Sequence, residues 1–210
     1  MPRLKQVSRA DAPPEINNHY DLVFGKARDP LVEAGTATGT PGNWHTVWAQ
    51  APKILKAFQA FGYRDATIDM KLLELAIMRT GYLRRSQFVY SQHCKGARAA
   101  EVSEEKIEAV PYWSSATCYD EAERNVMTFV DAVIAEDGRM PDRVIDDLKR
   151  HLTEVQILEL AYLVKSFDLH ATLCVAFRLE YDDAPERVVE IPRPPTPRAQ
   201  NWLDPTSWNT

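Results

Sequence analysis

The sequence lacks the features that mark several large classes of protein. It has three cysteines in 210 residues, too few for a disulfide framework or a cysteine-rich zinc site. It contains no G-x-G-x-x-G or Walker A pattern, and no two histidines have the spacing of metal ligands. We therefore expect neither a nucleotide cofactor nor a bound metal ion.

Long apolar runs and an excess of positive charge are also missing. No run approaches the roughly 18 apolar residues of a membrane span, and the first residues have no apolar core of a signal peptide. The formal net charge of −5 gives no reason to expect nucleic acid or an anionic membrane as partner. The sequence predicts a cytoplasmic protein, and its 45% of hydrophobic residues can build a sizeable core.

Proline marks both ends of the chain. Residues 1–42 hold several prolines and little periodicity, which predicts an N-terminal arm. Residues 184–210 form a proline-rich tail that also carries Trp202 and Trp208. Because tryptophan is rarely left exposed, we expect the tail to pack on its own domain or on a neighbouring subunit. Residues 43–183 then form the single folded domain.

This central region has helix signals throughout and no strand alternation, which predicts an all-α fold. Asp65 or Thr67 can cap the long apolar helix, Ser86 the next one, and Thr153 with Gln156 forms a capping-box pattern. Together with a short helix from Ser103, helices are expected over residues 43–48, 52–61, 67–83, 86–100, 120–138, 141–151 and 153–181.

Two of these expected helices share a short sequence. The letters LLELAIM at 72–78 recur as ILELAYL at 157–163. Two related helical hairpin halves, packed about a local two-fold axis, would explain the repeat. Chance similarity between two apolar helices explains it equally well, and both interpretations stay open.

A carboxylate within the first of these apolar runs has chemical meaning. Glu74 must be hydrogen-bonded, paired or protonated there, because burying a bare charge is costly. The short connection at 82–85 makes the next helix an antiparallel neighbour, and that helix carries His93. The pair could relay protons. For such a pair on its own, a buried hydrogen bond that ties two helices together is the more common interpretation.

The spacing of four residues resembles a known family. Glu74, Ser86, Val89 and His93 stand where E-x(11)-C-x(2)-C-x(3)-H has its glutamate, two cysteines and histidine. With YSQHCKGARAAEVSEEKIEAV and the segment from HLTEV to EYDD, this resembles the carboxymuconolactone decarboxylase and alkylhydroperoxidase D-like (AhpD-like) family over residues 44–183. The resemblance implies an AhpD-like helical bundle that assembles as a homo-oligomer, whether dimer, trimer or hexamer.

The chain departs from the family pattern at two positions. Ser86 and Val89 replace the redox cysteine pair, so a thiol peroxidase mechanism through this site is disfavoured. Val89 also stands where the decarboxylase branch has the glutamate of Y-E-W-x-x-H. What remains is His93 as general acid or base, Glu74 as its orienting or relay partner, and Tyr90 as a stabiliser of an oxyanion. Tyr90 could instead be a packing residue.

Five further residues are candidates for substrate binding. Trp44 and Trp48 are four residues apart and would form an aromatic face, either the wall of a pocket or a helix-docking surface, with His45 near its rim. Arg79 could clamp a substrate carboxylate or make an intersubunit salt bridge. Ser86 caps the helix that carries His93. Of the other histidines, His170 is expected in the core or at an interface and His19 at the surface.

These residues predict an enzyme that works by acid–base chemistry without a cofactor. The substrate would be a small carboxylated or aromatic-derived compound, decarboxylated, isomerised or cleaved by elimination through an enolate-like intermediate. Two alternatives stay open. One is a residual AhpD-like thiol peroxidase that uses Cys94, and the other is a non-catalytic binding or structural homologue.

Overall fold

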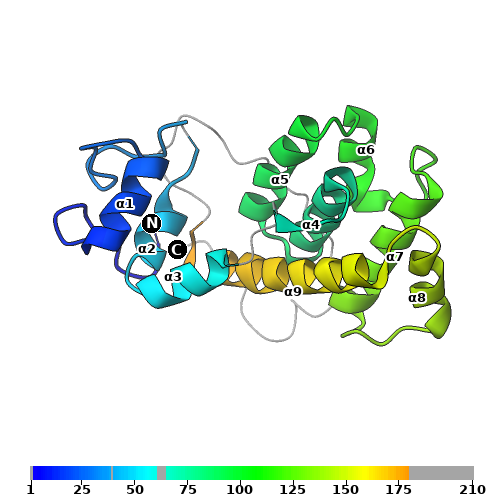
Figure 1. The fold of residues 1–210 in the computed structure, drawn as a ribbon. Coiled ribbons are helices and arrows are strands. Elements are labelled where there is room, and N and C mark those ends of the chain that lie inside the picture. Colours follow the sequence, from blue (N-terminus) through cyan, green and yellow to red (C-terminus); the bar gives the residue numbers. More distant parts are fainter. Residues whose placement is uncertain (1, 39, 61–64, 180–210) are drawn as a thin grey trace, which may run out of the picture.

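The computed structural model describes residues 2–38, 40–60 and 65–179, and every regular element in these ranges is helical. The expected all-α fold is confirmed. In chain order (Figure 1) the elements are α1 (Pro14–Val23), α2 (Asn43–Trp48), α3 (Pro52–Gln59), α4 (Met70–Arg84), α5 (Gln87–Ala99), α6 (Glu104–Ala109), the 3-10 turn η2 (Val110–Tyr112), α7 (Glu121–Ala135), α8 (Asp142–Lys149) and α9 (Glu154–Phe177).

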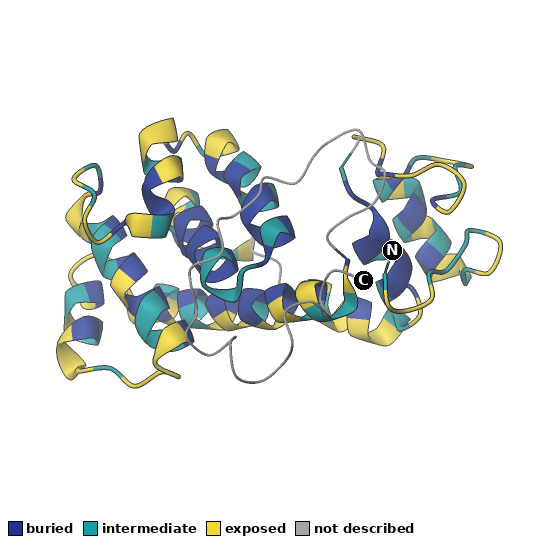
Figure 2. Ribbon diagram, turned by 180° about the vertical axis from the view of Figure 1, so that it is seen from behind, coloured by how far each residue is buried: buried dark blue, intermediate teal, exposed yellow. Residues whose placement is uncertain are grey.

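Helix α4 is the centre of the bundle. Its residues 73–81 are all buried, and it packs against α5, α7 and α9. A helix that is apolar on all sides has no polar face to turn to solvent, so it becomes the core element. In Figure 2 this helix lies inside the left-hand group of helices and is drawn mainly in dark blue. The polar members of α4 are therefore buried with it, Glu74 among them.

The turn from α4 to α5 brings these two helices close together. Arg85 ends α4 in the left-handed conformation with φ 58°, and Ser86 accepts a hydrogen bond from the Val89 N–H at 3.3 Å. A Cβ atom on Gly81 would lie 2.9 Å from the backbone nitrogen of Tyr90. The glycine therefore allows the two backbones to approach one another.

Most predicted helix starts are confirmed. Ser86 and Ser103 are N-caps, and Asp120 and Thr153 are N-caps with complete capping boxes. The start of α4 differs, because Asp69 accepts from the Lys71 N–H at 2.7 Å and is the cap in place of Asp65 or Thr67.

The two copies of the repeated letters have different surroundings. Thr67 donates its N–H and its hydroxyl to Glu159, at 2.8 and 2.9 Å. Glu159 is the counterpart of Glu74, yet it binds at the surface, whereas Glu74 is 1% exposed. The repeated sequence therefore does not give Glu74 and Glu159 the same structural role.

The N-terminal arm is more ordered than expected. Pro14 stands at the first turn of α1, where its missing N–H costs nothing, so the proline pair starts a helix. Tyr20 of α1 is fully buried and donates its hydroxyl to the Val7 carbonyl at 2.8 Å. Its cluster also includes Trp44, Cys174 and Leu179, which joins α1 and α2 to the C-terminal end of α9. The predicted tail at 184–210, with Trp202 and Trp208, lies outside the described residues.

Helix α9 lies along the main bundle, and its C-terminal end reaches the α1–α3 group (Figure 1). By length and composition it could cross a membrane, but the core helix of a soluble protein passes the same test, and α9 packs against α4, α5, α7 and α8. Its outer face exposes Val155, Leu158, Tyr162 and Leu169. A second copy could pack on this face, and the homo-oligomer stays a prediction.

The close approach of α5 at Gly81 predicts that replacing this glycine by alanine destabilises the protein, although the same change usually stabilises a helix. In an isolated helix, alanine is about 1 kcal/mol more favourable than glycine. In this fold Gly81→Ala should instead lower the free energy of unfolding by about 1–3 kcal/mol, because its Cβ meets the backbone of α5. Urea unfolding measures the difference. A more stable Gly81→Ala variant would contradict the close packing of α4 and α5.

Candidate functional site

The structure brings Glu74 and His93 together at the α4–α5 contact. Nδ1 of His93 lies 2.7 Å from Oε2 of Glu74. The carboxylate comes from the middle of the central helix and the imidazole from the second turn of α5. This places the ring nitrogen within hydrogen-bond distance of a carboxylate that has almost no contact with solvent.

Gly96 makes room for this carboxylate. It follows His93 by about one turn of α5, and a Cβ atom there would lie 2.5 Å from Cδ and 2.6 Å from Oε2 of Glu74. No such contact occurs in real proteins, so a larger residue at 96 would push the carboxylate away from its place. The sequence offered one signal for Gly96, a glycine in the interior of a helix, where glycine is otherwise unfavourable.

A cavity of about 540 Å³ borders the pair. Its walls come from α2, α3, α5 and α9, with Glu74 from α4, and half of the lining residues carry a phenyl, indole or imidazole ring. The edge of the His93 ring meets Phe167 with 4.7 Å between ring centroids. Fourteen residues line the cavity: Trp44, His45, Phe58, Gln59, Glu74, Phe88, Gln92, His93, Lys95, Gly96, Leu163, Ser166, Phe167 and His170.

Two candidates from the sequence, Trp44 and His45, line this cavity. Trp48 stands behind the wall, with its ring 5.9 Å from that of Trp44 and stacked at 6.5 Å on Phe58. The aromatic face of α2 is therefore at once part of a pocket wall and a packing surface. Trp44 therefore fits the interpretation as a pocket wall, and Trp48 fits the interpretation as a packing residue.

Tyr90 does not join the pair, contrary to the expectation. Its hydroxyl donates to the carbonyl of Ile107 at 3.3 Å, and its ring packs in a separate core cluster with Leu75 and Met78. Tyr90 and His93 are only about 60° apart around α5. The Tyr90 side chain nevertheless packs beside α6, where Ile107 accepts its hydroxyl, and it does not line the cavity. A role for Tyr90 in stabilising an oxyanion in this cavity is therefore dropped.

Arg79 and Ser86 also lie away from the cavity. The Arg79 guanidinium donates to both carboxylate oxygens of Asp131, at 2.6 and 3.0 Å, and to the backbone carbonyls of Val110 and Pro111. This bidentate pair joins α4 to α7, so the expected clamp on a substrate is not found. Ser86 is fully buried and acts as the cap of α5.

Three histidines outside the predicted pair surround the N-terminal wall of the cavity. His45 Nδ1 lies 2.9 Å from His19 Nε2. Burial lowers the pKa of His45 to about 3 and also lowers that of His19. His170, expected to be a core or interface histidine, lines the cavity, and burial lowers its pKa to about 3.

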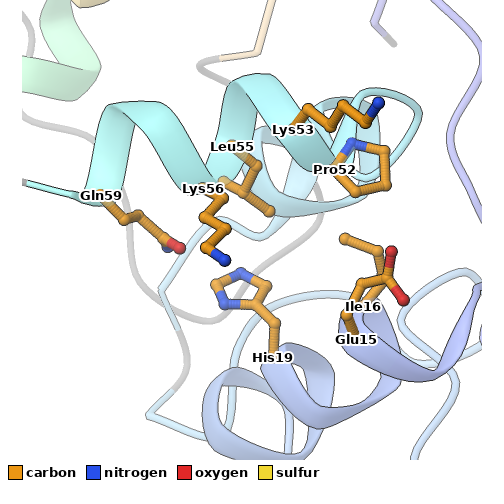
Figure 3. A pocket seen from close by; sticks show the side chains of 8 residues that line it. All are labelled: Glu15, Ile16, His19, Pro52, Lys53, Leu55, Lys56 and Gln59. Atoms are coloured by element: carbon orange, nitrogen blue, oxygen red, sulfur yellow. The ribbon is translucent and has the colours of Figure 1, made fainter.

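His19, expected at the surface, borders a second cavity. This cavity measures about 480 Å³ and lies between α1 and α3. In Figure 3 the imidazole of His19 points from α1 towards Lys56 and Gln59 of α3. The contact between His19 and His45 therefore links the walls of the two cavities.

The cysteines offer no redox pair near this site. Cys94 follows His93 in sequence but is 3% exposed and packs in the cluster of Tyr90, and burial raises its pKa to about 11. Its thiol therefore stays protonated and shielded at neutral pH. Neither Cys118 nor Cys174 lines the cavity.

Comparisons with known proteins agree with this geometry. Residues 50–132, which include Glu74, Gly96 and His93, match the model of the carboxymuconolactone decarboxylase family. The resemblance to this family is confirmed. No curated protein matches the chain at a significant level.

Solved structures show the same fold. A protein of unknown function from Agrobacterium tumefaciens, named for the antioxidant defence protein AhpD, is 25% identical, with a TM-score of 0.58 over 62% of this chain and 92% of that one. The AhpD core of an uncharacterised peroxidase-related protein from Ralstonia eutropha JMP134 is 17% identical, with a TM-score of 0.71 over 87% and 93%. A Cys-to-Ala variant of the debrominase Bmp8, in complex with 2,3,4-tribromopyrrole, is 18% identical, with a TM-score of 0.58 over 83% and 88%.

The fit of Gly96 against Glu74 predicts a strong coupling between the two positions. Gly96→Ala should lower the free energy of unfolding by about 1–3 kcal/mol, because the added Cβ displaces a buried carboxylate from its hydrogen bond. In a Glu74→Ala background the same substitution should cost nothing or stabilise the helix. Urea unfolding of the four proteins of this double-mutant cycle measures the coupling. Equal costs in both backgrounds would contradict the proposed contact.

The buried histidines predict a loss of stability in weak acid. His45 and His170 have pKa values of about 3 in the folded chain, whereas a histidine in an unfolded chain titrates near about 6.5. Between those values the unfolded chain binds protons that the folded chain does not. The free energy of unfolding is therefore intact above about pH 6.5 and falls below it, by up to about 1.4 kcal/mol per pH unit for each histidine.

Thermal unfolding followed from about pH 7 to about pH 5 tests this dependence. His170→Phe should reduce the slope, since one of the histidines that burial keeps neutral in the folded chain is removed. A midpoint that stays constant over this range would show that the histidines accept protons in the folded state.

Proposed function

We propose that the chain is an acid–base enzyme acting on a small aromatic-derived or carboxylated compound, through proton removal and return beside an enolate-like intermediate. The observation that carries the proposal is the 2.7 Å contact between Glu74 and His93 at the wall of an aromatic cavity. A buried carboxylate–imidazole pair that borders a ligand-sized cavity has the residue types and the access that general acid–base catalysis requires.

We infer different tasks for the two groups. An ionised Glu74 accepts the Nδ1 proton of His93, which leaves the lone pair of the ring on Nε2. His93 would then take a proton from the substrate with Nε2 and return it later. Glu74 holds the tautomer and orientation and stabilises the imidazolium that forms between these steps.

The walls of the cavity favour a flat substrate. Trp44, Phe58, Phe88 and Phe167 offer ring faces and edges, and about 540 Å³ is a volume suited to a small ligand. Lys95 also lines the cavity and would supply positive charge for a carboxylate or a developing enolate. The debrominase complex with 2,3,4-tribromopyrrole, a protein of the same fold with a small aromatic ring, supports a substrate of this kind.

A thiol peroxidase is the weaker alternative. AhpD-type neighbours favour it, but the two positions of the redox pair hold Ser86 and Val89, and the raised pKa of Cys94 removes the remaining thiol near the site. An enzyme that relies on His93 needs none of the three cysteines.

Screening lactones and aromatic carboxylic acids for turnover, followed by variants of the pair, tests the proposal. His93→Ala should lower kcat by about 10²–10⁴-fold, since the general base is lost. Glu74→Gln should lower kcat as well, because a neutral amide no longer stabilises the imidazolium. Tyr90→Phe is the matched control on the same helix and should keep kcat within about threefold, since its hydroxyl bonds Ile107 away from the cavity. Full activity in His93→Ala would end the proposal.

A further inference from the structure

His170 has an unusual position for a buried histidine. It lies on α9, is 9% exposed and lines the cavity that His93 and Glu74 border. Neither of its ring nitrogens has a hydrogen-bond partner among the residues that the structure describes. Since a neutral imidazole has one N–H to donate and one nitrogen to accept, two polar functions are left unsatisfied in the wall of a cavity.

The surroundings of His170 do not satisfy these functions. Its ring packs against those of Phe58, Phe88, Phe167 and Trp44, with centroids 5.1 to 6.4 Å away. The imidazoles of His45 and His93 are also near His170, but neither forms a hydrogen bond with it. Phenylalanine has neither a donor nor a lone pair in its plane. Trp44 has a donor only, and its Nε1 is itself buried without a partner in the described part of the chain. Two hydrogen-bond donors on adjacent rings thus lack an acceptor.

Rotation of the His170 ring can turn its nitrogens towards a ligand in the cavity. Both nitrogens are shielded from solvent, so the small exposed surface of this residue lies on its other atoms. A half-turn of the imidazole about the Cβ–Cγ bond exchanges the nitrogens with ring carbons. Phe167 contacts the rings of both His93 and His170, at 4.7 and 5.8 Å. A flat molecule resting against Phe167 therefore lies near the acid–base pair and near the unsatisfied donors.

Burying polar groups without partners is costly, and such groups in native proteins call for an explanation. Here both N–H groups lack an acceptor, and four of the lining residues are tryptophan or phenylalanine. We propose that His170, together with the Trp44 N–H, binds an oxygen atom carried on an aromatic ring, so that the ligands of this cavity are phenols or aromatic carboxylates in preference to plain aromatic hydrocarbons. This inference rests on the proposed function, because it names the substrate class of the same site.

Phenol and toluene form a matched pair of probes, equal in shape and different in one hydroxyl group. The full-length protein should bind phenol more tightly than toluene. His170→Phe keeps an aromatic ring in the wall and should reduce this preference by about tenfold while changing toluene affinity by less than about threefold. Trp44→Phe should reduce the preference in the same direction. Titration calorimetry, or saturation-transfer NMR for weak binding, measures the ratios.

A measurement on the unaltered protein keeps the test independent of how the variants fold. The ring ¹⁵N resonances of His170 should shift when phenol is added and stay in place with toluene. Three results would each overturn the assignment. They are an unchanged preference in a folded His170→Phe protein, His170 ring ¹⁵N resonances that do not shift when phenol is added, and a protein that binds neither probe.

The catalytic variants separate this inference from the proposed function. Glu74→Gln should lose turnover yet keep the preference for phenol over toluene, because it leaves His170 and Trp44 intact. If turnover depends on His93 but the preference for phenol is unchanged in His170→Phe, the proposed function stands and this inference is wrong. The opposite result would leave an oxygen-selective binding cavity without acid–base chemistry.

Discussion

The structure depends on one energetically unfavourable feature, the burial of the Glu74 carboxylate in the middle of its central helix. An ionised carboxylate that is 1% exposed would be strongly destabilising without compensation. His93 provides the partner from the neighbouring helix, and Gly96 provides the space in which the carboxylate fits. Ser86 starts α5 in the place that puts both residues opposite Glu74. A polar group retained at such cost in an apolar core is more easily understood as chemistry than as packing.

The N-terminal region completes the site from the other side. Residues that the sequence marked as an arm include α1, and its cluster with α2, α3 and the end of α9 holds Trp44 and His45 against the cavity. The chain thus closes an otherwise bare α5–α9 surface with elements that come first in sequence. The same region contains His19 and His45, and burial lowers the pKa of both histidines.

Local signals explain why the helices were predictable. A cap such as Ser86, or the pair Thr153 and Gln156, acts through hydrogen bonds within four residues, and sequence spacing determines whether those form. The start of α1 was missed because two adjacent prolines indicate a break as readily as a first turn. A helix forms there because Tyr20 of α1 is buried, and its burial depends on contacts with residues far away in the chain.

The all-α class, most helix starts and the resemblance to the carboxymuconolactone decarboxylase family could be predicted from residue spacing in the sequence. The pairing of Glu74 with His93 could be predicted as well, because a buried charge needs a partner. Only the tertiary structure decided which neighbours share the cavity. Tyr90 was separated from His93 by the direction of its side chain on α5, Arg79 was committed to Asp131, and His170 was brought to the site from a helix 77 positions further along the chain. Such placements depend on how whole helices pack, and side-chain packing acts between residues that no local spacing connects.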